Sequence, residues 1–463
     1  MADKKAKKIK KIKRIRSGFF GRGVSLSKMA LGSGARLAGH KLRHAFSDDA
    51  ARDQEFEKLL AMQAERIVSE LGHLKGTLMK VGQLIAVLGE NQLPPRVVDA
   101  FKSLQADSSS LPWKQVRKIL NRRMGVDWPD KLIVEEEAFA AASIGQVHRA
   151  TIKDTGEQIC LKIQYPGVEK AISSDIKALR SILKMFKFVG SDESRLDEIL
   201  REVQLMMRRE MDYLQEAATT QRFYDFLQND QAFKVPRVYH EFCSKKILAT
   251  QYLSGVSFQH ETVQELSLDR RNAMAENLLR ITWAEIFELN DLQTDTHFGN
   301  YLVQIDPDGE QDRIILLDFG AMRKFSKDFR KATSMMINAC LDWNETALEQ
   351  GLRWHRVILP GDSEEIIKAY LESVWICMEM VRAPEDTEAD NWEGDIYVFE
   401  KSTLLERNHK ANIEIIKMTN FRGAPGEYIF LGRKLAGLYG IICKLKPRIN
   451  LRKLIEFHQQ NIT

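Results

Sequence analysis

One stretch of this 463-residue chain is the most informative about its fold: Gln293-Thr294-Asp295-Thr296-His297-Phe298-Gly299-Asn300. It places a carboxylate, Asp295, five residues before a carboxamide, Asn300. Two short β-like runs follow, at 301–305 and 313–317, on either side of a turn at 306–309, and Asp318-Phe319-Gly320 comes directly afterwards. Either motif alone occurs often by chance. Their order and spacing together predict a single site that contains Asp295, Asn300 and Asp318.

Lys162 is the next candidate, because it lies among apolar residues in the middle of a predicted strand, Cys160-Leu161-Lys162-Ile163-Gln164. A buried lysine is costly unless it has an anionic partner, although a lysine on an edge strand can reach water instead. A strand lysine followed by D-x4-N, a hairpin and DFG matches the order in protein kinases. There the lysine binds the α- and β-phosphates, the first Asp accepts a proton, and the Asn and second Asp hold Mg²⁺. We therefore expect ATP or ADP with Mg²⁺ as cofactors, Lys162 and Asp295 as catalytic residues, and Asn300 and Asp318 as metal ligands.

The secondary-structure pattern predicts an α+β, bilobal, kinase-like fold. β-like runs at 133–134, 145–150 and 158–164 are followed by helical periodicity over 166–228 and a strand pair at 237–242 and 246–252. The chain is then mostly helical, apart from the two short runs around 301–317, and an acidic stretch at 384–395 is predicted to be a solvated loop. A small β-rich lobe before a large helical lobe is the order of kinase domains. The predicted domains are a basic flexible tail (1–25), a helical N-terminal extension (26–130), an N-lobe (131–254) and a mostly helical C-lobe (255–463).

Composition limits the class of protein. The five cysteines are widely spaced and form no CxxC pair, which fits reduced thiols in a cytosolic compartment. No apolar run approaches the ~18 residues of a membrane span, and the charged N-terminus lacks the apolar core of a secretory signal. We expect a cytoplasmic protein without a transmembrane segment.

The first 16 residues hold nine Lys or Arg and one Asp, a local charge of +8 against +5 for the whole chain. The remainder is therefore slightly acidic, at about −3, so the basic character belongs to the tail. Apolar residues recur every third position among the lysines, at Ile9, Ile12 and Ile15. This pattern favours peripheral binding to the anionic inner face of a membrane. Contact with nucleic-acid phosphates and a merely solubilising tail are the alternatives. Nucleic acid is not favoured, because no aromatic-interleaved basic patch occurs elsewhere.

Four further motifs resemble the UbiB/AarF family of atypical kinases, whose members are linked to coenzyme Q biosynthesis. Lys80-Val81-Gly82-Gln83 is similar to the KxGQ motif of that family, and Ala140-Ala141-Ala142-Ser143 to its alanine-rich nucleotide loop. Glu210-Met211-Asp212, with Glu216 shortly after, is similar to its ExD motif, and Tyr165-Pro166-Gly167-Val168 also fits. The resemblance covers roughly residues 60–445.

The resemblance implies roles for several of these residues. Lys80 and Gln83 would gate the cleft, and Glu210, Asp212 and Glu216 would be regulatory. Glu210 and Glu216 are both candidate partners of Lys162 or Lys80. A spacing of six on one helix would point the two side chains in different directions, so they are expected to have different partners, but the spacing does not decide which glutamate pairs with which lysine. Alanines restrict a loop that ordinary kinases build from glycine, so the nucleotide should bind differently there; small residues packing a β-turn are the alternative interpretation. The expected nucleotide-binding residues are Ala140, Ala141, Ala142, Ser143, Lys162, Gln251, Tyr252, Leu253, Asn300 and Asp318.

The sequence also departs from the kinase pattern. Thr296 stands where the family often has Pro, and His297 where protein kinases commonly have Lys. The predicted hinge Gln251-Tyr252-Leu253 has no acidic residue, which leaves adenine selectivity open. Ala383-Pro384-Glu385 spells a kinase motif, but 65 residues beyond Asp318, and is interpreted as coincidence.

The expected function is that of an atypical kinase or ATPase supporting lipid-quinone biosynthesis at a membrane surface, with adenine nucleotide as a ligand. A lipid-quinone intermediate or biosynthesis proteins are further expected partners. A nucleotide-switched lipid-binding protein with negligible turnover is the first alternative. An ordinary Ser/Thr protein kinase is the second, and the alanine loop and the missing peptide-docking segment disfavour it.

Overall fold

The computed structural model describes residues 110–142, 144–169, 193–309, 311–381, 391–419 and 426–460, and a few positions between 172 and 180. They belong to two compact units. The first unit contains the described residues up to Ala218 together with Arg237–Tyr252, and the second contains Thr219–Pro236 and the described residues from Leu253 onward. The basic tail, Lys80, Gln83, Ser143 and the Ala383-Pro384-Glu385 motif lie outside the described residues.

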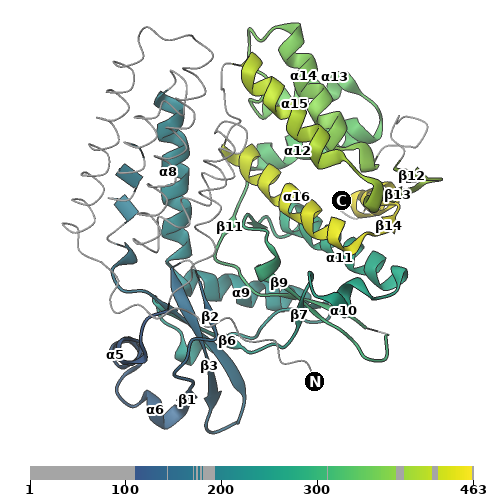
Figure 1. Ribbon diagram of the computed structural model, residues 1–463. Helices are drawn as coiled ribbons and strands as arrows, with labels where there is room; N and C mark the ends of the chain where they lie inside the picture. Colours follow the sequence, from purple (N-terminus) through teal and green to yellow (C-terminus); the bar gives the residue numbers. More distant parts are fainter. Residues whose placement is uncertain are drawn as a thin grey trace, which may run out of the picture. The chain divides into compact units, whose positions relative to one another are not determined.

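The first unit is built on a five-stranded antiparallel sheet in the order β1-β3-β4-β6, with β2 also paired to β3 (Figure 1). The predicted strands at 133–134, 145–150 and 158–164 are confirmed as β1, β3 and β4. Register places Val147, Lys162 and Leu248 side by side across the three long strands. The strands are β1 (Leu132–Val134), β2 (Ala140–Ala141), β3 (Gly145–Ile152), β4 (Gln158–Gln164) and β6 (Ile247–Gln251).

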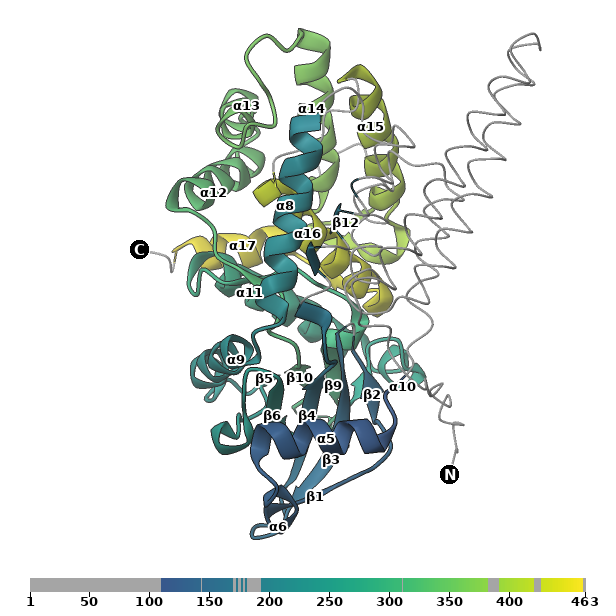
Figure 2. The same ribbon diagram turned by 90° about the vertical axis from the view of Figure 1, so that its left-hand side faces the viewer.

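One face of this sheet is covered by helix α5 (Trp113–Met124), which is followed by the short helix α6 (Trp128–Lys131). Alternate residues of β3 are buried, among them Gln146 and His148. The Trp113 ring lies 5.7 Å from the His148 ring, and Leu111 N donates a 2.6 Å hydrogen bond to Gln146 Oε1. Figure 2 shows α5 lying across β3 and β4. Lys162, which pairs with Val147, lies on the opposite side of the strands from α5.

The helical region predicted over 166–228 is broken in two, so that prediction was wrong at one point. Helix α8 (Glu193–Glu210) ends before Met211, and α9 (Tyr213–Leu227) begins after Asp212. The carboxylate Oδ1 of Asp212 accepts hydrogen bonds from the backbone N–H groups of Leu214 (3.2 Å) and Gln215 (3.3 Å). Asp212 thus caps α9, because those N–H groups have no partner within the helix. Glu210 and Glu216 therefore lie on different helices, and the directions of their side chains do not follow from a spacing of six on one helix.

The predicted strand at 237–242 is also only partly present. Val238 forms an isolated bridge to Thr250, and Gln251 N donates to Arg237 O at 2.8 Å. The chain then turns into the 3-10 helix η1 (His240–Phe242) instead of continuing along β6.

The second unit contains a four-stranded sheet in the order β5-β10-β9-β7 and a two-stranded pairing of β8 with β11. The β-like runs predicted at 301–305 and 313–317 are confirmed as β9 and β10, which pair antiparallel. The turn between them closes with a hydrogen bond from Gly309 N to Asp306 O, and Gly309 has a φ of 82°. The strands are β5 (Phe233–Lys234), β7 (Val256–Ser257), β8 (Leu292–Gln293), β9 (Tyr301–Gln304), β10 (Arg313–Leu316) and β11 (Met322–Arg323).

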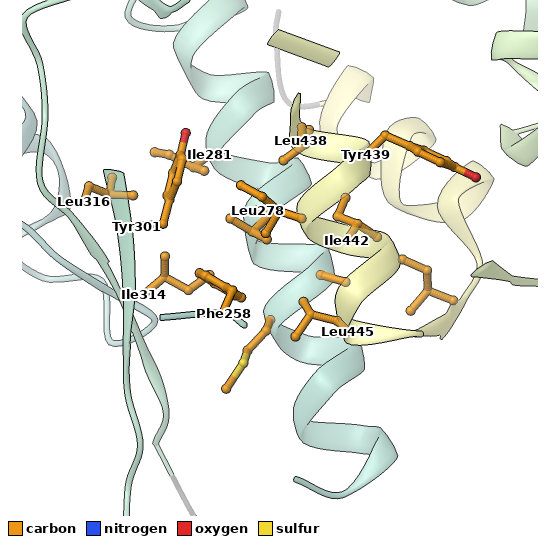
Figure 3. Packing of buried hydrophobic residues seen from close by; sticks show 14 of the residues in the cluster. Phe258, Leu278, Ile281, Tyr301, Ile314, Leu316, Leu438, Tyr439, Ile442 and Leu445 are labelled. Atoms are coloured by element: carbon orange, nitrogen blue, oxygen red, sulfur yellow. The ribbon is translucent and has the colours of Figure 1, made fainter. Parts of the chain in front are cut away.

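The core of the second unit lies between this sheet and two long helices, α11 (Leu268–Phe287) and α16 (Gly426–Leu445). Figure 3 shows Leu278 and Ile281 of α11 packed beside Leu438 and Ile442 of α16, with side chains of β9 and β10 on the other side. Burying aliphatic side chains of this kind contributes about 1.5–3 kcal/mol each. The core therefore holds α16, although it is distant in sequence, against the elements that carry Asp295 and Asp318.

The remaining helices of this unit are α10 (Glu261–Gln264), α12 (Lys327–Leu341), α13 (Glu345–Trp354), α14 (Glu364–Cys377), α15 (Leu404–Met418) and α17 (Leu451–Gln460). The acidic stretch 384–395 is not wholly a loop as predicted. Its last residues enter a three-stranded sheet of β12 (Trp392–Glu393), β13 (Ile396–Val398) and β14 (Arg448–Ile449). Within the described ranges, no helix has the length and apolar character that crossing a membrane requires. All five cysteines are described and are free thiols.

Candidate functional site

In the first unit, Lys162 forms an ion pair with Glu216. The Nζ of Lys162 lies 2.6 Å from Oε1 of Glu216, and the two side chains are 18% and 3% exposed. The ammonium also lies 5.3 Å from the centre of the Tyr213 ring, which is in the same turn of α9. Because β4 has a neighbour on each side, the interpretation of Lys162 as an edge-strand lysine is wrong. Glu216, at the start of α9, is thus the carboxylate that pairs with Lys162, while Glu210 is buried at the end of α8.

The alanine-rich segment forms a tight turn beside Lys162. Ala140 and Ala141 make up β2, opposite Val147 and Gln146 of β3, and Ala142 N donates a 2.9 Å hydrogen bond to Gly145 O. A Cβ at Gly145 would lie 2.6 Å from Ile163 O and 2.9 Å from the Tyr213 hydroxyl. Only glycine fits there, because no real Cβ tolerates such contacts. This close approach brings the turn onto the strand and helix that hold the Lys162 ion pair.

The predicted hinge begins where β6 ends. Tyr252 N donates to Gln158 O at 3.0 Å, which continues the pairing with β4 by one residue beyond Gln251. The guanidinium of Arg149 packs against two aromatic rings that also contact each other, 4.1 Å from the centre of Phe139 and 4.7 Å from that of Tyr252. Leu253 is buried and begins the second unit. The hinge residues are thus ordered by backbone pairing and cation–π packing.

In the second unit, two strand pairings bring the predicted ligands together. Tyr301 pairs with Leu316 at the start of β9, and Leu317 N then donates to Asn300 O at 3.1 Å, which sets Asn300 beside the residue preceding Asp318. On the other side, β8 pairs with β11, and both the N–H and the hydroxyl of Thr294 donate to Ala321 O. The DFG segment is therefore bracketed by the two ends of the D-x4-N loop.

The oxygen atoms of Asn300 and Asp318 suit a magnesium ion. Asn300 Nδ2 donates a 2.7 Å hydrogen bond to Asp295 O, which orients the amide so that its Oδ1 is the atom left to bind a cation. Asp318 Oδ1 accepts a 2.8 Å hydrogen bond from Gly320 N. Among the described residues, no three His, Cys, Asp or Glu side chains gather as a metal site. An Asp–Asn pair still fits Mg²⁺, because this ion is typically held by one or two carboxylates together with substrate phosphates.

Arg433 of α16 is a residue that sequence reasoning missed. Its Nη2 lies 2.6 Å from Asp295 Oδ1, and both side chains are only 12–13% exposed. The helix approaches the loop closely, since a Cβ at Gly437 would lie 2.5 Å from Thr296 O. His297 also serves the loop, because its Nδ1 accepts a 3.0 Å hydrogen bond from Gly299 N. Arg433 therefore holds one carboxylate oxygen of the predicted base in position.

Nothing near Arg433 in the sequence points to this role, because its partner lies 138 residues earlier. Gln293, two residues before Asp295, is a second functional residue that the sequence did not predict. Its Nε2 donates to Asp318 O and ties the β8 strand to the DFG segment. The sequence predicted no strand at this position, so the role of Gln293 follows only from the two-residue strand β8 in the structure.

A kinase-like catalytic loop, a DFG segment and a strand lysine paired with a helix carboxylate define the class as a divergent kinase-like domain. The comparisons agree, because residues 103–352 match the ABC1 atypical kinase-like domain. The chain belongs to this family of atypical kinases, also called UbiB, as its motifs predicted. The α+β kinase-like fold is likewise confirmed.

Individual relatives support the assignment over most of the chain. The atypical kinase COQ8B, mitochondrial, of Rattus norvegicus is 31% identical over 94% of this chain and 77% of its own length. The probable serine/threonine-protein kinase abkA of Dictyostelium discoideum is 30% identical over 94% and 78%. The atypical kinase COQ8, mitochondrial, of Saccharomyces cerevisiae is 28% identical over 85% and 75%.

A solved structure shows a similar fold. The complex of Rv3197 with erythromycin from Mycobacterium tuberculosis superposes with a TM-score of 0.53, covering 88% of this chain and 97% of that one. Its sequence identity is 24%, so this likeness concerns the fold alone.

Proposed function

We propose that this protein is an ATP- and Mg²⁺-dependent atypical kinase or ATPase that supports ubiquinone (lipid-quinone) biosynthesis at a membrane surface. The observation that carries the proposal is the bracketing of Asp318 by the two ends of the D-x4-N loop, which sets Asn300 next to the DFG segment. The Lys162–Glu216 ion pair supplies the phosphate-binding group that the same chemistry needs.

In this proposal each residue has a defined task. Lys162, oriented by Glu216, binds the α- and β-phosphates. Asn300 and Asp318 hold Mg²⁺, which neutralises the charge of the phosphates when bound. Asp295 orients the attacking hydroxyl or water and accepts its proton. Ala140 to Ser143, Gln251, Tyr252 and Leu253 form the remaining nucleotide contacts, and Lys80 and Gln83 gate access.

Thermal unfolding tests nucleotide binding directly. Mg-ATP or Mg-ADP should raise the melting temperature, because a ligand that binds only the native state stabilises it by mass action. Asp318→Asn should remove the Mg²⁺ dependence and leave the unliganded melting temperature unchanged. A folded sample that shows no shift at millimolar nucleotide would refute the proposal.

The link to lipid-quinone biosynthesis rests on the COQ8 relatives, whose names also place them in mitochondria. We propose peripheral membrane association through the basic tail at 1–16. Truncation of residues 1–20 should abolish flotation with anionic liposomes, and added salt should weaken binding of the full chain, since exposed charges are screened over ~8 Å at physiological ionic strength. Equal flotation of both proteins would exclude the tail as the membrane contact.

A second candidate, a nucleotide-switched lipid-binding protein with negligible turnover, is favoured by the Arg433–Asp295 ion pair. That pair occupies an oxygen of the carboxylate that turnover requires. A coupled ATPase assay with and without anionic liposomes separates the two. Turnover that rises with lipid supports the enzyme, whereas nucleotide binding without turnover in either condition supports the switch.

A further inference from the structure

The second unit contains a buried ion pair that the proposed chemistry does not use. Lys434 of α16 lies with its Nζ 2.7 Å from Oε2 of Glu285 of α11. The Lys434 residue is 0% exposed and Glu285 is 2% exposed. Removing two charges from water costs several kcal/mol per ion, and the attraction between them offsets this only with good geometry and further hydrogen bonds. A pair of this kind therefore calls for a reason other than stability.

Two further polar groups complete a network around this pair. The Lys434 ammonium also donates a 3.2 Å hydrogen bond to the Tyr301 hydroxyl, and that hydroxyl donates to Oε1 of Gln293. Gln293 N lies 3.4 Å from Oε2 of Glu285, which closes the ring of contacts. Gln293 Nε2 then donates to the backbone oxygen of Asp318. Tyr301 and Gln293 are themselves 2% and 5% exposed.

The network joins residues at both ends of the D-x4-N loop. Gln293 lies two residues before Asp295, and Tyr301 directly follows Asn300, so the network holds both ends of the D-x4-N loop. Its fifth member is the backbone of Asp318. Asn300 is thus joined to the buried ammonium through its neighbour Tyr301, and the segments of Asp295 and Asp318 are joined to it through Tyr301 and Gln293.

Burial acts on both charged groups of the pair. It raises the pKa of the Glu285 carboxyl, and the nearby Lys434 ammonium opposes that rise. Burial alone would lower the pKa of Lys434, but the charges and hydrogen bonds of Glu285 and Tyr301 outweigh it and raise this pKa. Lys434 therefore stays protonated and continues to donate to Tyr301 at neutral pH.

We propose that the network of Glu285, Lys434, Tyr301 and Gln293 is a positioning device that fixes the spacing of Asp295, Asn300 and Asp318 for the metal–nucleotide complex. This inference rests on the proposed function. Lys434 and Tyr301 are positioning residues, because both are buried and act through the ends of the loop.

Tyr301→Phe is the most conservative test, since it deletes the hydroxyl that joins Lys434 to Gln293 and keeps the ring in the core. The Mg²⁺ concentration for half-maximal nucleotide binding should rise about tenfold, the equivalent of one buried hydrogen bond. Nucleotide binding measured with EDTA should not change. Tyr397→Phe is a matched control, because Tyr397 is also fully buried in the second unit and its hydroxyl donates to Glu379 and lies 2.7 Å from Ser402 Oγ.

A lower melting temperature in both variants without a change in Mg²⁺ dependence would overturn the proposal, because the network would then serve stability alone. The double variant Glu285→Leu, Lys434→Met makes the same distinction, since an apolar replacement of a buried ion pair commonly keeps or raises stability. It should remain folded and show the same tenfold weaker response to Mg²⁺. A folded double variant with the native response would contradict the inference.

Amide hydrogen exchange without ligand keeps this test separate from the proposed function. Tyr301→Phe should speed exchange both at 293–301 and at 318–321, two segments that the network joins, whereas Tyr397→Phe should affect neither. If the native protein shows no Mg²⁺-dependent nucleotide binding, the proposed function fails, and exchange still decides the inference. Faster exchange in both segments supports the network, and unchanged exchange in either segment overturns it.

Discussion

Arg433 and Asp295 form a 2.6 Å ion pair across 138 residues of sequence, and both side chains are nearly buried. The guanidinium holds the carboxylate of the catalytic loop in one orientation, because a charged hydrogen bond in a poorly solvated site is stronger than one in water. This contact makes α16 part of the candidate site.

Arg433→Ala should lower the ATP turnover number at least tenfold, because the freed Asp295 loses its orientation toward the attacking group. Nucleotide affinity should stay within about threefold, since Arg433 pairs with Asp295, which the proposed function assigns to proton transfer and not to holding the metal or the nucleotide. Arg448→Ala is the control, as it removes an exposed arginine that pairs with Glu393 at the surface. Steady-state kinetics and calorimetry measure the two quantities. If turnover rises instead, the ion pair restrains Asp295, and the nucleotide-switch candidate gains support.

Two glycines of α16 offer a matched pair of substitutions. Gly437→Ala would place a Cβ 2.5 Å from Thr296 O, whereas a Cβ at Gly440 meets nothing within 4 Å. Gly440→Ala should stabilise the protein by about 0.5–1 kcal/mol, because alanine loses less conformational freedom than glycine in a helix. Gly437→Ala should instead destabilise it by roughly 1–3 kcal/mol through overpacking.

Turnover should also fall in Gly437→Ala, because the displaced residue directly follows Asp295. Denaturant unfolding and ATPase rates decide between the outcomes. Equal effects of the two alanines on both measurements would mean that α16 does not constrain the loop.

Glu216→Gln should weaken binding of Mg-ATP about tenfold. The substitution removes the charge that orients Lys162, and a lysine without its carboxylate no longer presents its ammonium at one position. Glu157→Gln is the control in the same unit, since Glu157, directly before β4, pairs with Arg237 and both side chains are more than 40% exposed. Such exposed pairs contribute about 0–1 kcal/mol. Titration calorimetry compares the two variants, and an unchanged affinity in Glu216→Gln would remove the Lys162–Glu216 pair from the nucleotide site.

The sequence predicted those parts of the site whose signals are local. Lys162 in an apolar strand and the five-residue interval from Asp295 to Asn300 are patterns within ten residues. Strand β4, which carries Lys162, and strand β9, which follows Asn300, were predicted within one residue, whereas β8 before Asp295 was not predicted. Arg433 and Lys434 carry no such signal, because their partners are brought near only by the packing of α11 against α16.

Two structural features were not predicted from the sequence, each for a physical reason. The break between α8 and α9 was missed because the apolar spacing continues through Asp212, although Asp is a strong N-cap residue. Strands β12 and β14 are two residues long and are too short to show any periodicity. Strand β12 pairs with β13 across a short turn, whereas β14 pairs with β13 from about 50 residues away, which local patterns do not record.

The last prediction concerns His355, which lies at the end of α13 among apolar residues of the second unit. Its ring lies 4.3 Å from that of Phe329 and 5.6 Å from that of Tyr428, and its Nε2 lies 3.2 Å from Thr333 Oγ1. Burial lowers the pKa of His355 from 6.5 to about 4, because the charged imidazolium is poorly solvated there. The unfolded chain therefore binds a proton between pH 6.5 and 4 that the folded protein does not bind. Stability from this residue is full above pH 6.5 and is lost as the pH falls toward 4, by about 3 kcal/mol in total.

His355→Gln should make the free energy of unfolding fall less steeply between pH 6.5 and 4.5, because the variant lacks this proton uptake. Its stability at pH 7.5 is expected to be lower, so the comparison is between slopes and not between absolute values. His409→Gln is the control, since His409 is an exposed histidine of α15, and its slope should equal that of the native protein. Urea unfolding at a series of pH values measures all three proteins. A native slope in His355→Gln would show that the folded protein accommodates the charged imidazolium, and that the packing of Phe329 and Tyr428 around it opens more readily than their ring distances indicate.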